Sequence, residues 1–118
     1  MPSVTYKVLR AAGVDRDLDL IFDFLVATAE SFGEPAASAF TLAEKRLADI
    51  ERGMADLGAA PHQGTLRPHL GAGIRNVTKG RAIFYFDLDE PSETLRVLAV
   101  FFGGQDHETR ILLRLLSQ

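Results

Sequence analysis

The side chains in this sequence that are able to do chemistry are four cations and two proton-transfer groups in its second half: Arg75, Lys79, Arg81, Arg96, Tyr85 and His107. Metal-independent cleavage of RNA needs a base for the ribose 2′-hydroxyl, an acid for the leaving oxygen and cations for the phosphorane charge. The arginines and the lysine supply cations, and the tyrosine or the histidine supplies a proton relay. A nuclease would therefore use Arg75, Arg81, Tyr85 and His107 as its catalytic residues.

Each of these residues also has a structural explanation. Arg75, Arg81 and Arg96 can pair with acids across the neighbouring strand turns, at Asp87, Glu90 and Glu93. Tyr85 fits a half-buried aromatic residue of a sheet. We expect no metal site and no cofactor, because the short spacing of zinc ligands is absent from the three histidines, His62, His69 and His107.

Charge is distributed unevenly along the 118 residues, whose formal net charge is −3. Residues 1–56 hold six bases and ten acids, residues 57–86 hold four bases and no acid, and residues 87–118 hold three bases and six acids. The middle segment creates a local basic field that can attract an acidic partner, a phosphate backbone or an acidic peptide, and the alternative is chance clustering of bases on a solvated loop and hairpin. The acidic total argues against sequence-independent binding of nucleic acid, which depends on neutralising phosphates. We expect no direct sequence-specific binding of nucleic acid either.

Length and composition predict one domain over residues 1–118. The chain is 47% hydrophobic and 25% charged, within the usual range of globular domains. It has no cysteine, which is compatible with a reducing cytoplasm. Neither a signal peptide nor an apolar run long enough to cross a bilayer is present, so we expect a cytoplasmic protein without a membrane partner.

The hydrophobic pattern predicts an α+β fold in the order strand, helix, helix, strand, strand, strand, helix. We expect strands at 4–9, 74–78, 81–88 and 94–102, and helices at 15–32, 36–57 and 107–116. The strand at 94–102 is apolar almost throughout, which is typical of a central strand buried on both faces. The apolar stripes of the first two helices predict a helical hairpin packed on the sheet. Gly103 and Gly104 then let the chain leave the sheet, and Asp106 is the expected cap of the last helix.

Four phrases of the sequence stand in a characteristic order: residues 17–24 (DLDLIFDF), 73–75 (GIR), 81–86 (RAIFYF) and 95–106 (LRVLAVFFGGQD). Together they resemble the ParE-like branch of the RelE/ParE superfamily, the toxins and plasmid stabilisation proteins of bacterial type II toxin–antitoxin modules. The resemblance covers residues 4 to about 115. It implies an α/β sandwich in which an antiparallel sheet packs on a helical hairpin.

The resemblance also implies a toxin that a ParD-like antitoxin binds and neutralises in a hetero-oligomer. ParE-like toxins inhibit DNA gyrase, whereas RelE-like toxins cut mRNA on the ribosome and need catalytic residues. We expect gyrase inhibition rather than enzyme activity, because the protein is acidic and its last residues, LLRLLSQ, contain no terminal tyrosine or basic cluster. The alternatives are a ribosome-dependent mRNA endoribonuclease and a non-toxic interaction module.

Two partner-binding surfaces are predicted. The antitoxin is expected to contact the acid-free segment 57–86, which we call the basic strip, and the face of the helical hairpin, through Arg75, Lys79, Arg81, Phe40 and Leu47. The target is expected to contact the C-terminal strand and helix, where the branches of the superfamily differ, through Arg96, Gln105, His107 and Arg110.

Overall fold

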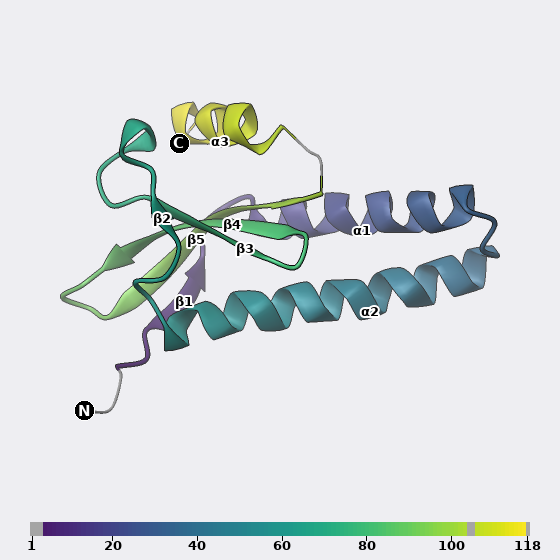
Figure 1. The fold of residues 1–118 in the computed structure, drawn as a ribbon, viewed down its shortest axis with the longest axis horizontal. Helices are drawn as coiled ribbons and strands as arrows, with labels where there is room; N and C mark the ends of the chain where they lie inside the picture. Colours follow the sequence, from purple (N-terminus) through teal and green to yellow (C-terminus); the bar gives the residue numbers. More distant parts are fainter. Residues whose placement is uncertain (1–3, 104–105, 118) are drawn as a thin grey trace.

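A five-stranded sheet lies between a long helical hairpin and a short C-terminal helix in the computed structural model, which describes residues 4–103 and 106–117 (Figure 1). The helices are α1 (Val14–Ser31), α2 (Ala36–Ala55) and α3 (His107–Leu116). The strands are β1 (Lys7–Arg10), β2 (Thr65–Leu66), β3 (Arg75–Lys79), β4 (Ala82–Asp89) and β5 (Thr94–Phe102). Two short 3₁₀ helices are η1 (Asp56–Ala59) and η2 (Pro68–Leu70). The predicted α+β fold is confirmed, with α1 and α2 on one face of the sheet and α3 on the other.

The strands follow the order β1-β5-β4-β3-β2 across the sheet. Neighbouring strands from β2 to β5 are antiparallel, as the sequence predicts, whereas β1 pairs with β5 in parallel. A parallel pair needs a long crossover connection, and here most of the chain lies between its two strands. The sheet is therefore mixed rather than wholly antiparallel.

Strand β5 is buried on both faces, which confirms its predicted central position. One core lies under the helical hairpin and takes from β5 Leu95, Val97, Val100 and Phe102. The second core faces α3 and takes from β5 Leu98, Ala99 and Phe101. The register with β4 shifts here, since Tyr85 pairs with Ala99 but Phe86 pairs with Val97. Leu98 is thus the extra residue of a β-bulge, which explains why Val97 and Val100 share a face.

Residues 58–73, where the sequence predicts no helix or strand, contain β2 and η2, and the helix predicted at 36–57 ends at Ala55 and is followed by η1. Strand β1 begins at Lys7 instead of Val4. The amide of Tyr6, just before β1, donates to the carbonyl of Gly58 at 2.8 Å. A Cβ at Gly58 would lie 2.1 Å from the carbonyl oxygen of Tyr6, so only glycine allows this approach.

The last helix begins as predicted. The Asp106 carboxylate accepts a hydrogen bond from the amide of Thr109 at 3.3 Å, which confirms its role as the N-cap. Gly103 has φ 65°, the left-handed conformation that glycine adopts without strain. Gly104 and Gln105, the rest of this predicted corner, lie outside the described residues. No described helix is both long and apolar enough to cross a membrane.

Candidate functional site

The candidate nuclease residues do not meet around one point. The Tyr85 hydroxyl lies 2.7 Å from His107 Nδ1, but the tyrosine is fully buried between the sheet and α3. Arg75 and Lys79 stand at opposite ends of β3, about 13 Å apart along the strand, and Arg81 follows the turn at the Lys79 end. The structure therefore joins the two proton-transfer groups and separates Arg75 from Lys79 and Arg81.

The structure contains one of the predicted pairings with acids and replaces another by a different contact. Arg96 pairs with Asp87 across the β4–β5 hairpin at 3.0 Å, which confirms the structural explanation for that arginine. Arg81 instead places its guanidinium 5.6 Å from the centre of the Phe102 ring, a cation–π contact. Arg81, Arg96 and Arg75 therefore each have a different contact and do not converge on one anion-binding site.

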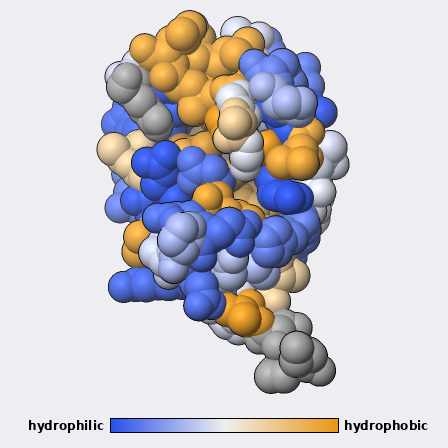
Figure 2. All heavy atoms as spheres, turned by 90° about the vertical axis from the view of Figure 1, so that its left-hand side faces the viewer, coloured by the Kyte–Doolittle hydropathy of each residue, from blue (hydrophilic) through white to orange (hydrophobic). Residues whose placement is uncertain are grey.

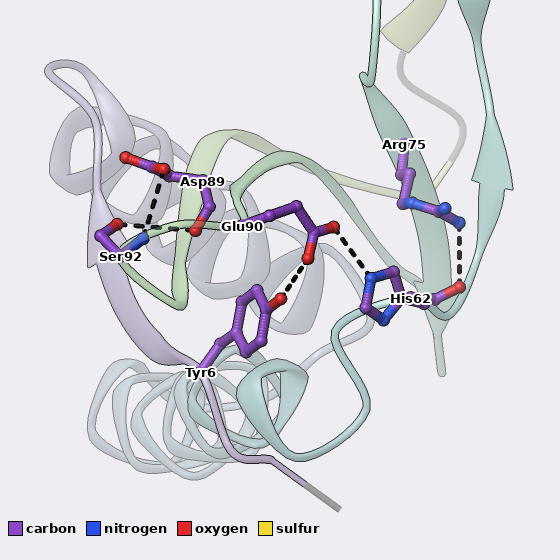
Figure 3. A network of polar contacts seen from close by, with 6 residues as sticks. All are labelled: Tyr6, His62, Arg75, Asp89, Glu90 and Ser92. Atoms are coloured by element: carbon purple, nitrogen blue, oxygen red, sulfur yellow. Dashed lines mark hydrogen bonds and ion pairs between the residues drawn. The ribbon is translucent and has the colours of Figure 1, made fainter.

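Arg75, at the start of β3, belongs to a polar network that joins the segment before β1, the loop after η1 and the β4–β5 turn (Figure 3). Glu90 is its centre: one carboxylate oxygen accepts a hydrogen bond from the Tyr6 hydroxyl, and the other lies 2.9 Å from His62 Nε2. Arg75 Nη1 donates to the backbone carbonyl of His62 at 2.9 Å. The sequence pattern did not link these residues, because their partners are separated by 28 and 84 positions.

This network, the Glu90 network of Tyr6, His62, Arg75 and Glu90, perturbs two ionisations. The hydrogen bond to Glu90 raises the pKa of Tyr6 to about 12, because it is made only by the protonated hydroxyl beside a carboxylate. The hydrogen bonds from Tyr6 and then from His62 lower the pKa of Glu90, with a smaller contribution from the charge of Arg75. Glu90 is thus stabilised as a carboxylate in the folded protein.

A buried ion pair that the sequence reasoning missed joins α1 to α3. Arg114 Nη2 lies 2.5 Å from Asp17 Oδ1, and the aspartate is only 6% exposed. The backbone hydrogen bonds between the β1 side of the sheet and β5 end where the amide of Ala11 donates to the carbonyl of Val97. Beyond that point Arg114 donates to the carbonyl of Leu98 at 3.1 Å, and Asp17 accepts from the amide of Val100 at 3.0 Å. The two side chains therefore satisfy backbone groups at the bulge that β1 does not reach.

A surface pocket of about 320 Å³ lies between α1 and α3 beside this ion pair, lined by Arg16, Leu20, Arg110, Leu113 and Arg114 among others. Of the three predicted target-binding residues that the structure describes, Arg110 alone lines it. His107 contacts Tyr85, Arg96 pairs with Asp87, and Gln105 lies outside the described residues. The three described residues, Arg96, His107 and Arg110, have separate contacts and do not line one pocket.

Two predicted antitoxin-binding residues come together in another pocket, of about 230 Å³, between α2 and the β3–β4 turn. We call it the basic pocket and define it by Arg46, Ile50, Gly53, Lys79, Arg81 and Phe84. Arg46 was missed in the sequence because it lies on α2, some thirty positions before the other two cations. Arg75 is not part of the pocket, because it belongs to the Glu90 network.

The predicted hairpin contacts differ in exposure. Phe40 is 50% exposed and packs edge-on against Phe22, with ring centres 5.0 Å apart, whereas Leu47 is partly buried against the main core. A second set of exposed apolar side chains lies on α3: Leu112, Leu113 and Leu116. Figure 2 shows a group of apolar residues at the top of the view, above a mostly hydrophilic region. The top of this view corresponds to the level of α3 in Figure 1.

No cluster of three or more metal-ligating side chains occurs in the part of the chain that the structure describes. Two of the histidines are instead engaged in single contacts, His62 with Glu90 and His107 with Tyr85. The described histidines therefore bond to neighbouring side chains and do not gather into a cluster of metal ligands.

Solved structures share this arrangement of helices and strands. A chain of the chromosomal ParDE toxin–antitoxin system from P. aeruginosa matches 86% of this chain and 99% of its own length, with a TM-score of 0.64 and 21% sequence identity. A chain of the RelBE2 toxin–antitoxin complex from Mycobacterium tuberculosis matches 84% of this chain and 92% of its own, with a TM-score of 0.59 and 20% identity. The chain has the RelE/ParE toxin fold. The fold expected from the four sequence phrases is thus confirmed, although no protein-family model and no curated protein matches the sequence.

Proposed function

We propose that this protein is the toxin of a type II toxin–antitoxin module and that a ParD-like antitoxin neutralises it by direct binding. The RelE/ParE fold supports this proposal, because both similar structures come from toxin–antitoxin systems. The basic pocket supports it as well, because an acidic partner segment suits a local group of cations. The module would act in the cytoplasm, where its target is found.

We further propose DNA gyrase as the target. The observation that carries this choice is the dispersal of the candidate nuclease residues. A nuclease needs its cations and proton-transfer groups around one phosphate, but Arg75 bonds the carbonyl of His62 while Arg81 lies at the opposite end of the β3–β4 hairpin. Tyr85 is fully buried, so its hydroxyl has no open path to a polynucleotide. Inhibition by binding needs none of this chemistry, and the protein would not be an enzyme.

A ribosome-dependent mRNA nuclease is the second candidate, favoured by one contact. Tyr85 and His107 form a 2.7 Å hydrogen bond, which is suitable geometry for passing a proton. Displacement of α3 would be needed to bring this pair to a substrate, because the helix covers the tyrosine.

Supercoiling of relaxed plasmid by purified DNA gyrase tests the proposal. Added protein is expected to block supercoiling or to trap cleaved DNA, and the antitoxin is expected to restore activity. No inhibition at large molar excess, together with cleavage of mRNA on ribosomes, would instead establish the nuclease. Induced expression without growth arrest would contradict both and indicate a non-toxic interaction module.

A further inference from the structure

We infer that the basic pocket binds an acidic side chain of a peptide segment, through its carboxylate and the hydrocarbon part next to it. This inference rests on the proposed function, in which the segment belongs to the antitoxin. It goes further by naming the pocket, the ligand group and a cation from α2 that the basic strip of the sequence does not contain.

The charges of the basic pocket come from two elements and are not neutralised within the protein. Arg46 extends from α2, while Lys79 and Arg81 flank Gly80 in the β3–β4 turn. Across residues 4–103 and 106–117, none of these three cations forms an ion pair. The acid that also lines the pocket, Asp49, is paired with Arg52 one turn along the same helix. A carboxylate entering the pocket would therefore meet cations that are not paired with another carboxylate, although the Arg81 guanidinium also lies over the Phe102 ring.

The shape of the basic pocket suits a side chain that is both charged and partly apolar. Ile50 and Phe84 are buried and form an apolar floor below the cations. Gly53 lies inside α2, where glycine costs about 0.5–1 kcal/mol relative to alanine. A Cβ there would be in ordinary van der Waals contact with Lys79 Cδ at 3.6 Å and Phe84 Cζ at 3.8 Å, so glycine leaves the volume of one methyl group unfilled beside these two residues. The aliphatic part of a glutamate fits such a floor, and its carboxylate reaches the rim.

The distribution of cations favours a peptide over a polynucleotide. A polynucleotide presents a phosphate at every step and is bound by a track of cations. Here the other bases of the acid-free segment are engaged: Arg67 pairs with Glu108 at 2.7 Å, and Arg75 bonds the carbonyl of His62. The basic pocket is thus an isolated group of three cations on a protein of net charge −3, which matches single carboxylates better than a phosphate chain.

The direct test is a titration of the ¹⁵N-labelled protein with the peptide acetyl-Glu-Leu-Asp-Leu-Glu-amide, followed by NMR. We expect the amide signals of Gly53 and Gly80 to shift, and we expect the Lys79→Glu variant to raise Kd about tenfold. Lys45→Glu is the matched control, because it makes the same charge change on α2 outside the pocket and should leave Kd unchanged. Arg46→Glu, at an exposed position, repeats the test if Lys79→Glu does not fold.

Three results would overturn the inference. Equal binding of acetyl-Gln-Leu-Asn-Leu-Gln-amide would show that the carboxylates are not recognised. Equal loss of affinity in Lys45→Glu would show a response to net charge alone. Tighter binding of the oligonucleotide (dT)₁₀, with shifts at the same amides, would identify a nucleic-acid site instead.

Growth of cells that express the protein separates this inference from the proposed function. If the parent protein causes no growth arrest, the toxin proposal fails, and the peptide titration still decides whether the pocket binds carboxylates. If the parent and both variants arrest growth, the cognate antitoxin should rescue the parent and Lys45→Glu but not Lys79→Glu. Full rescue of Lys79→Glu would overturn the assignment of the pocket to the antitoxin.

Discussion

The two ends of the β3–β4 hairpin carry similar cations that differ in whether groups of the protein itself bind them. At one end Arg75 bonds the carbonyl of His62 and lies near Glu90, which Tyr6 and His62 hold in place. At the other end Lys79 and Arg81 face a pocket and form no ion pair with any described residue. Both ends belong to one acid-free stretch of sequence. A run of bases in the sequence is thus divided in the fold, because groups from distant segments engage Arg75 while Lys79 and Arg81 keep no carboxylate partner among the described residues.

If this division is correct, the contacts satisfied within the protein should contribute to stability and the open cations should contribute to binding. The largest effect is expected at Asp17, the most buried of the satisfied acids. Asp17→Ala leaves Arg114 without its partner and the Val100 amide without its acceptor. We expect a loss of about 3–5 kcal/mol in the free energy of unfolding, measured by urea denaturation.

The control for this variant is Asp15→Ala in the same first turn of α1. Asp15 accepts from Arg10 at 2.7 Å, but its side chain is 84% exposed. An exposed ion pair contributes about 0–1 kcal/mol, so the control should remain close to the parent. Equal losses in the two variants would show that the Asp17 contact adds nothing beyond a surface ion pair.

The Glu90 network should make stability depend on pH in the alkaline range. Because the pKa of Tyr6 is raised to about 12, its hydrogen bond contributes fully below the ordinary value of about 10 and is lost as the pH rises through 12. The stability advantage of the parent over Tyr6→Phe should therefore shrink between pH 10 and 12. Urea denaturation of both proteins across this range measures it, and a constant difference would contradict the assignment.

At acidic pH, the stability that the Glu90 network contributes should change in the opposite direction with pH. The pKa of Glu90 is lowered, so its contribution is present above the ordinary pKa of a glutamate and is lost as the pH falls through the lowered value. The advantage of the parent over Glu90→Gln should accordingly decrease on acidification below about pH 4.3. A stability difference that grows toward acid would show that Glu90 is not held as a carboxylate.

The sequence predicted what depends on periodicity. The helical hairpin and the continuous burial of β5 follow from local patterns that the structure confirms. The half-buried position predicted for Tyr85 is wrong, because α3 covers that face of the sheet and the side chain is fully buried. The parallel pairing of β1 with β5 does not, because strand direction is set by the path of the whole chain. Local patterns also leave no sign of contacts such as Asp17 with Arg114, which are 97 positions apart.

Only part of the candidate site could be predicted, because the sequence pattern is local and the site combines distant segments. Lys79 and Arg81 are close in the sequence, so their common location is a local property of a tight turn. Arg46 joins them only because α2 packs across that end of the sheet. In the sequence, Arg75 is equivalent to the other cations of the basic strip. The fold makes it different, because it brings Glu90 and His62 beside it.

Gly53→Ala should separate stability from binding at the open end. The added Cβ makes ordinary contacts at 3.6 and 3.8 Å and removes the helix cost of glycine, so we expect a gain of about 0.5–1 kcal/mol in unfolding free energy. The same methyl group enters the basic pocket and should weaken binding of the acidic peptide. Gly58→Ala is the contrasting variant, because its Cβ would lie 2.1 Å from the Tyr6 carbonyl and must lower stability.

The smallest effect is expected at Lys79, and it tests the comparison most directly. Lys79→Gln breaks no ion pair with a described residue and relieves repulsion from Arg46 and Arg81, so unfolding free energy should change by less than about 0.5 kcal/mol. Arg75→Gln makes a similar charge change at the other end but removes the bond to the His62 carbonyl, and it should cost more. Urea denaturation of the two variants gives the difference. A loss for Lys79→Gln as large as that for Arg75→Gln would mean that Lys79 already has a partner within the fold, and that the basic pocket is not open to receive a carboxylate.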